Sequence, residues 1–170
     1  MGEIDQDIIK NSFKNLSRNT PIALVVGAAG FLGSHIVEHL LSKNIQVIGV
    51  DNLTTGSRDH LKEANKNKNF HFIEISAQNI GSVHSPRLDY IFFAAGGGWN
   101  IKSILEIAKQ FKSKIVFPSF IDLYDSHIDN RLQWFKEAEA QLARFSHLNK
   151  LNTRVVRLAS VYGPRMHFQE

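Results

Sequence analysis

The stretch VVGAAGFLGSH, residues 25–35, decides the fold. It follows an apolar run typical of a fully buried strand, and it opens a segment with helical periodicity. Gly27, Gly30 and Gly33 fit G-x-x-G-x-x-G, a variant of the dinucleotide-binding fingerprint. Glycine is needed there for a tight turn, for close approach of the backbone to a pyrophosphate, and for packing of helix against strand. The stretch therefore predicts a dinucleotide-binding unit.

Two features beside this stretch predict the ligand. Phe31 and Leu32 begin the predicted helix, so their N–H groups would face an anion. Asp51 ends the next predicted strand, 18 residues after Gly33, where a carboxylate can hold both ribose hydroxyls. Because this carboxylate would repel a 2′-phosphate, NAD is expected rather than NADP. Two other interpretations stay open, namely a glycine-rich turn without a ligand and an aspartate that only ends a strand.

The rest of the chain alternates strands with helices. This order predicts an α/β fold with a Rossmann-type doubly wound parallel sheet in three α/β/α layers and right-handed crossovers. The predicted strands are 22–26, 45–50, 70–75, 89–95, 114–117 and 153–159, and the predicted helices are 31–43, 57–66, 100–111 and 132–148.

The chain is expected to hold one domain behind a short leading segment. Residues 1–20 are predicted to form an amphipathic N-terminal helix and its connection, packed on the domain or on a partner, because apolar residues recur there at helical spacing. Residues 21–170 are predicted to form one NAD-binding domain. The total of 170 residues, 43% of them hydrophobic, suits a single core, and no repeat or linker divides it.

Composition argues against several classes of function. The net charge of +4 is modest and scattered, so we expect no nucleic-acid binding. No apolar run approaches the roughly 20 residues that span a membrane. The absence of cysteine excludes disulfides and thiolate catalysis and fits a cytoplasmic protein. His35 and His39 have a spacing that can bind a metal, but they do not form H-E-x-x-H, and no metal site is predicted.

Four segments resemble one family in the order in which they occur. VVGAAGFLGSHIVEHLL, GVDNLTTGSRDHL, FFAA and VVRLASVYGPRMH are similar to the extended short-chain dehydrogenase/reductase family of nucleotide-sugar epimerases, dehydratases and decarboxylases. DNLTTG and YGPRMH are most similar to UDP-glucuronate decarboxylases. The resemblance implies tightly held NAD and a nucleotide-sugar substrate. It also implies transient oxidation of a hexose C4 hydroxyl, followed by elimination, epimerisation or decarboxylation.

The resemblance also implies which residues bind the cofactor. The pyrophosphate would be bound by Gly27, Gly30, Phe31, Leu32 and Gly33. The adenosine ribose would be held by Asp51 and Asn52, with Thr55 and Gly56 nearby. The adenine would lie beside Ser76 and Ala77, which replace the family's Asp-hydrophobic pair. The channel beside the cofactor would be lined by Ala94, Ala95 and Gly96, and Ser119 would approach the nicotinamide end.

The chain departs from the family at the catalytic positions. The family uses a Ser or Thr at the end of the fifth strand and a Tyr-x-x-x-Lys pair on the next helix, whose tyrosine takes the sugar hydroxyl proton. Alignment of SFIDLYD with the family motif puts Phe120 at the hydroxyl position. Glu139, 18 residues before Arg157, matches a family glutamate. This register puts Arg131 at the tyrosine position and Phe135 at the lysine position.

A few groups remain as catalytic candidates. Asp122 matches the family's acidic position, and Tyr124 matches a structural tyrosine. Ser119 supplies the hydroxyl nearest the strand end. A register shifted by one residue would make Lys136 the lysine, but Leu132 would then replace the tyrosine.

Three hypotheses about function follow. The first is an NAD(H)-binding protein without the family's Ser/Thr-Tyr-Lys catalysis, acting as a sensor or as the partner of an active homologue. The second is an active nucleotide-sugar enzyme whose site is completed by atypical residues or by a partner chain. The third is an interaction domain without a cofactor. Because the chain ends where the family continues into a substrate-binding lobe, exposed apolar surface and self-association are expected.

Overall fold

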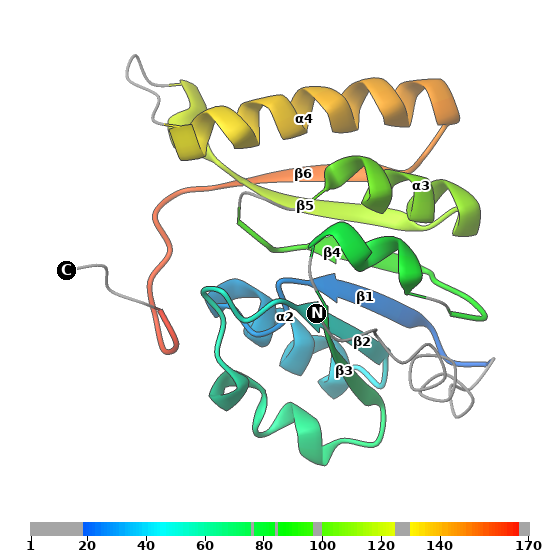
Figure 1. Ribbon diagram of the computed structural model, residues 1–170, viewed down its shortest axis with the longest axis vertical. Helices are drawn as coiled ribbons and strands as arrows, with labels where there is room; N and C mark the ends of the chain where they lie inside the picture. Colours follow the sequence, from blue (N-terminus) through cyan, green and yellow to red (C-terminus); the bar gives the residue numbers. More distant parts are fainter. Residues whose placement is uncertain (1–18, 76, 84, 97–99, 125–129, 167–170) are drawn as a thin grey trace.

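A computed structural model describes residues 19–166 except 76, 84, 97–99 and 125–129. Its sheet has six parallel strands in the order β3-β2-β1-β4-β5-β6 (Figure 1). The strands are β1 (Ile22–Val26), β2 (Gln46–Asp51), β3 (Phe70–Glu74), β4 (Tyr90–Phe93), β5 (Lys114–Phe120) and β6 (Thr153–Leu158). The helices are α2 (Phe31–Ser42), α3 (Ile101–Phe111) and α4 (Asn130–Asn149), with 3₁₀ helices η1 (Arg58–Leu61), η2 (Ala64–Lys66), η3 (Ala77–Ser82) and η4 (Ile121–Tyr124).

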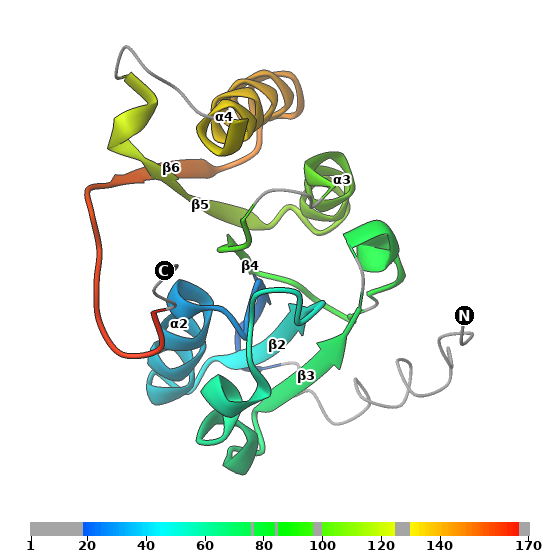
Figure 2. The same ribbon diagram turned by 60° about the vertical axis from the view of Figure 1, so that its left-hand side comes forward.

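The predicted doubly wound parallel fold is confirmed. Strand β1 lies between β2 and β4, and every one of its five residues is fully buried, as expected for a central strand covered on both faces. Helix α2 covers one face, while α3 and α4 cover the other, which gives three layers (Figure 2). The predicted amphipathic helix of residues 1–20 lies almost wholly outside the described residues.

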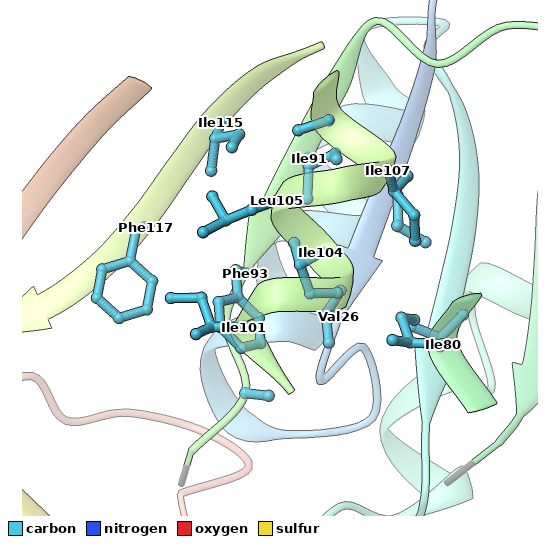
Figure 3. Close-up of a cluster of buried hydrophobic side chains, with 14 of the residues drawn as sticks. Val26, Ile80, Ile91, Phe93, Ile101, Ile104, Leu105, Ile107, Ile115 and Phe117 are labelled. Carbon is cyan, nitrogen blue, oxygen red and sulfur yellow. The ribbon is translucent and has the colours of Figure 1, made fainter. Parts of the chain in front are cut away.

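The larger apolar core lies between the sheet and the layer of α3 and α4. Helix α3 directs Ile101, Ile104 and Leu105 toward side chains of β4 and β5, including Phe93 and Phe117 (Figure 3). The smaller core joins α2 to the opposite face of β1 and β2. These two cores hold the carboxyl ends of the strands at one edge, and the strand order reverses between β1 and β4. In open α/β sheets this point is where ligands bind.

The predicted polar helix at 57–66 is wrong. The segment instead forms η1 and η2, two short 3₁₀ turns. It buries only two apolar side chains, Leu61 and Ala64, which are too few for an α-helical stripe. In addition, Ser57 N and His60 Nδ1 both bond to Ala29 O, at 3.0 and 2.8 Å, and they fix the segment against the glycine loop.

The first strand has the predicted bounds, and the other predicted elements are present with shifted ends. Strand β5 continues to Phe120, three residues beyond the predicted 114–117, because it pairs with β6 as far as Phe120↔Leu158. Its pairing with β4 ends at Phe92↔Val116, so Pro118 lies past the part of β5 that is flanked on both sides. A proline is tolerated in a strand where no ladder bond needs its N–H. The extension brings Ser119 and Phe120 to the carboxyl edge.

Within the described residues, no helix is both long and apolar enough to cross a membrane.

Candidate functional site

The glycine loop between β1 and α2 is built so that only glycine fits at its first position. Gly27 has φ +79°, a left-handed conformation, and a Cβ there would lie 2.7 Å from the Cα of Ala95 at the end of β4. Its N–H donates to Val50 O at 2.9 Å, and its carbonyl accepts from Gly30 N at 3.1 Å. The loop is therefore closed against both neighbouring strands, with the switch point of the sheet beside it.

The start of α2 supplies unbonded donors next to this turn. The first intrahelical bond runs from Ser34 N to Gly30 O at 3.0 Å, so the N–H groups of Phe31, Leu32 and Gly33 precede it and have no helical acceptor. Gly30 is the N-cap and contributes no side-chain cap. This arrangement of free donors at a helix N-terminus is suited to a phosphate group.

The third glycine of the motif allows the helix to lie directly on the loop. A Cβ on Gly33 would come within 1.9 Å of Gly27 O, whereas a Cβ on Gly30 would meet only that same oxygen, at 3.3 Å. The two positions therefore differ in kind. Gly33 is required by packing, and Gly30 faces space that a ligand can occupy.

Asp51 connects the end of β2 to the glycine loop. It is 5% exposed, its Oδ2 accepts from Ala29 N at 2.9 Å, and its Oδ1 accepts from Leu53 N at 2.8 Å. The alternative of a strand-end role thus has a structural basis. It does not exclude the ribose role, because each carboxylate oxygen can accept a second hydrogen bond.

The residues after Asp51 form the rim of the predicted adenosine site. Asn52 Oδ1 accepts from Thr54 N at 3.1 Å, and Thr55 is exposed. Gly56 lies under the loop, where a Cβ would be 2.9 Å from the backbone carbon of Ala29. On the adenine side, Ser76 and the side chain of Ala77 lie outside the part of the chain that the structure describes.

The end of β4 forms the opposite wall. Ala94 N donates to Val26 O at 2.9 Å, and Ala95 is buried against Gly27. Gly96 is exposed, and a Cβ there would meet nothing within 4 Å. The structure therefore brings together the glycine loop, Asp51 and the end of β4.

The carboxyl end of β5 is occupied by aromatic side chains. Phe120 packs edge-to-face on Phe135 of α4, with ring centroids 4.8 Å apart. Phe135 is 4% exposed. Its ring also packs against the rings of Phe117 and Trp134, with centroid distances of 5.9 and 4.9 Å. Packed phenylalanines thus occupy the two positions predicted from the sequence to match the family's hydroxyl and lysine.

The other catalytic candidates differ in their exposure. Ser119 is fully buried beneath α4, near Glu139, and its Oγ makes no hydrogen bond of normal geometry. Asp122 is exposed on η4. Lys136 is exposed beside a pocket of about 260 Å³ that Glu139 also lines. The side chains of Tyr124 and Arg131 lie outside the described part of the structure.

Glu139 joins α4 to β6 through Arg157. Its carboxylate, 13% exposed, accepts from Arg157 Nη2 at 2.8 Å and Nε at 3.3 Å. Partial burial acts to raise the pKa of Glu139, but the hydrogen bonds and charge of Arg157, with the nearby Ser119 hydroxyl, hold the pKa below its usual value. The alignment of Phe135 with the family's lysine, which used the spacing of Glu139 and Arg157, stays a prediction.

This pKa shift predicts a pH-dependent contribution to stability. Because the native pKa lies below the ordinary 4.5, the pair stabilises the fold at neutral pH and loses its effect as pH falls through the native pKa. We expect Glu139→Gln to lower the free energy of unfolding by about 1 kcal/mol at pH 7, a modest amount because Arg157 is half exposed. Urea denaturation across the pH range measures this difference.

The matched control is Glu137→Gln, which alters an exposed carboxylate on the same helix and should change stability by less than about 0.5 kcal/mol. The Glu139→Gln and wild-type curves should converge as the pH falls through the native pKa of Glu139, because the carboxylate is then protonated. A difference between them that stayed constant from neutral to acid pH would contradict the assignment.

Contacts of α2 and the glycine loop with distant segments had no local signal in the sequence. Arg165 pairs with Glu38 at 2.6 Å, and His35 Nε2 lies 3.1 Å from Pro164 O, so the segment after β6 returns to α2 (Figure 2). His60, which contacts Ala29 O, was also missed. These partners lie 127, 129 and 31 residues apart in the sequence, beyond the reach of any spacing argument.

Comparison with known proteins agrees with this geometry. The model of the NAD dependent epimerase/dehydratase family matches residues 23–117, more than half of the chain. A UDP-glucuronate 4-epimerase of Thermodesulfobacterium geofontis is 32% identical over 181 residues, which cover 83% of this chain and 56% of that protein. UDP-glucuronic acid decarboxylase 6 of Arabidopsis thaliana is 25% identical and covers 86% of this chain and 52% of its own length.

A solved structure gives the same result. The UDP-glucose 4-epimerase of Thermotoga maritima, crystallised with UDP-glucose, superposes with a TM-score of 0.69 at 27% identity, over 85% of this chain and 57% of that one. The chain spans about half the length of the curated relatives it matches. It belongs to the NAD dependent epimerase/dehydratase family, and the resemblance inferred from the sequence is confirmed.

Proposed function

We propose that this member of the NAD-dependent epimerase/dehydratase family binds NAD(H) and does not carry the family's Ser/Thr-Tyr-Lys chemistry. The observation that supports this proposal is the difference between the glycine loop and the end of β5, which lie at the same carboxyl edge of the sheet. The glycine loop retains Gly27, Gly30 and Gly33 with Asp51 behind it, while Phe120 and Phe135 pack together at the aligned catalytic positions. In the family, bound NAD accepts a hydride from the sugar during transient oxidation.

The residues that would hold the cofactor have separate roles. The free N–H groups of Phe31, Leu32 and Gly33, at the start of α2, would donate hydrogen bonds to the pyrophosphate oxygens. Asp51 would take the ribose hydroxyls with lone pairs not used by Ala29 and Leu53. Its negative charge disfavours a 2′-phosphate, so NAD would bind more tightly than NADP.

The remaining residues explain why turnover is not expected. Proton transfer from a sugar hydroxyl needs a group that can be deprotonated at neutral pH, held within hydrogen-bond reach of the substrate. A phenylalanine at either aligned position supplies none. Lys136 and Asp122 are exposed, and Ser119 is buried beneath α4. A nucleotide-sugar, if it binds, would be held without conversion.

Association with a second chain, either another copy or an active homologue, is a further part of the proposal. On the edge strand β6, Val155 and Val156 are 38% and 42% exposed, and Tyr162 just beyond it is 89% exposed. Apolar surface of this kind on an edge strand favours covering by another chain.

The proposal is tested by calorimetry with NAD, NADH and NADP on the wild type and on Gly30→Ala. The added methyl group meets only Gly27 O, at 3.3 Å, and otherwise projects into the proposed pyrophosphate space. The variant should therefore fold, with NAD affinity at least about tenfold weaker. Gly81→Ala is the control, because a Cβ at Gly81 meets nothing within 4 Å.

Activity is measured in parallel with UDP-glucuronate and UDP-glucose. No product and no change in NADH absorbance are expected. Sustained turnover by the pure protein would instead favour the hypothesis of an atypical active enzyme. A folded protein that binds none of the three dinucleotides would favour the interaction domain.

A further inference from the structure

We infer, on the basis of the proposed NAD(H) binding, that this site recognises the ADP-ribose part of its ligand and draws no affinity from the nicotinamide. A doubly wound sheet of this strand order consists of two mononucleotide-binding halves that meet at the switch point. Here the halves are β1-β2-β3 and β4-β5-β6. The two halves differ in what they present at the carboxyl edge.

The first half is built for a charged ligand. It contains the glycine loop, the free donors at the start of α2, and a buried aspartate whose Oδ2 accepts from Ala29 N of the loop and whose Oδ1 accepts from Leu53 N. Ser57 N and His60 also hold Ala29 O from the other side, at 3.0 and 2.8 Å. The loop is thus fixed in place before any ligand arrives, and a preorganised site loses less entropy on binding.

The second half presents mainly apolar groups where its strands end. Strand β5 ends in Phe120, which is packed on Phe135, and β6 ends in Leu158 beside it. The one hydroxyl of the β5 end, Ser119, is fully buried on the α4 side, near Glu139. A carboxamide or ribose placed at this edge would lose water without gaining a hydrogen bond from either strand terminus.

As far as residue 166, where the described part ends, the segment after β6 runs toward the first half. It crosses to α2, where Arg165 pairs with Glu38 and the Pro164 carbonyl meets His35 (Figure 2). Gly163 lies against the ring of Phe31, at the start of α2, with a built Cβ 3.7 Å from that ring. This segment therefore reinforces the phosphate-binding half.

These observations predict that the site binds ADP-ribose and its derivatives, and that the group attached to the second ribose does not affect the affinity. NAD, NADH and free ADP-ribose share this part, and they should bind with dissociation constants within about threefold of one another. Nicotinamide mononucleotide, which carries only the other half, should not bind at about 1 mM.

The experiment is calorimetry of the full chain with NAD, ADP-ribose and nicotinamide mononucleotide. Gly30→Ala should weaken NAD and ADP-ribose by the same factor, because both place their pyrophosphate at that glycine, and Gly81→Ala should change neither. NAD binding more than about tenfold tighter than ADP-ribose would overturn this inference and leave the proposed function intact. Failure of both NAD and ADP-ribose to bind would overturn the proposed function itself.

Discussion

Gly33→Ala is expected to lower the free energy of unfolding by about 3 kcal/mol and to remove dinucleotide binding. The new Cβ would lie 1.9 Å from Gly27 O, 2.7 Å from Gly27 C and 3.1 Å from Ala28 Cα. All three atoms belong to the backbone of the glycine loop, so none can rotate away as a side chain could. The helix start must move off the loop, and the N–H groups that face the proposed pyrophosphate move with it.

Helix propensity acts in the opposite direction and is too small to offset the clash. Replacing a helical glycine by alanine normally favours the folded state by up to about 1 kcal/mol. The expected loss is therefore a net value. In a domain of this size it corresponds to a fall in Tm of about 10 °C, which thermal denaturation followed by circular dichroism would detect.

The control is again Gly81→Ala, whose added methyl group has no neighbour within 4 Å. Its Tm should remain within about 2 °C of the wild type. A Gly33→Ala protein with unchanged Tm and unchanged NAD affinity would show that α2 does not rest on the loop as described here.

The sequence was sufficient for the fold because its signals there were local. The buried run of β1, the glycine spacing and the alternation of strands with helices each depend on neighbouring residues, and the strand order follows from them. The segment at 57–66 was misassigned as a helix for a related reason. Its conformation is fixed by Ala29 O, which accepts from Ser57 and His60 roughly 30 residues away in the chain.

The placement of Asp51 beside the glycine loop could be predicted, whereas the packing at the end of β5 could not. The spacing from Gly33 to Asp51 was enough to place the aspartate beside the loop. Its bonds to Ala29 and Leu53 leave it with a structural role as well, which a residue type cannot reveal. Likewise, the sequence predicted that the family's lysine is missing, but not that Phe135 is buried among other aromatic rings.

Phe135→Lys, which introduces the family's residue type at the aligned position, is expected to lower the free energy of unfolding by about 4 kcal/mol and to produce no turnover. Phe135 is 4% exposed and contacts Phe117, Phe120 and Trp134. An ammonium group at this position would lose its hydration water. The three rings that Phe135 contacts carry no carboxylate that could compensate for this loss. Its pKa would fall, and the aromatic packing would be lost in addition.

Lys136→Ala is the control on the same helix. It shows whether any substitution in α4 lowers the free energy of unfolding, or only one at Phe135. Lys136 is exposed, so its removal should change stability by less than about 0.5 kcal/mol, as measured by urea denaturation. The same variant tests the shifted register, in which Lys136 is the catalytic lysine.

A Phe135→Lys protein that kept its stability and gained epimerase or decarboxylase activity would contradict this prediction. It would show that the aromatic cluster can be replaced and that the rest of the catalytic site is intact. Unfolding without activity, with Lys136→Ala unaffected, would show that the cluster is now part of the core on which α4 depends.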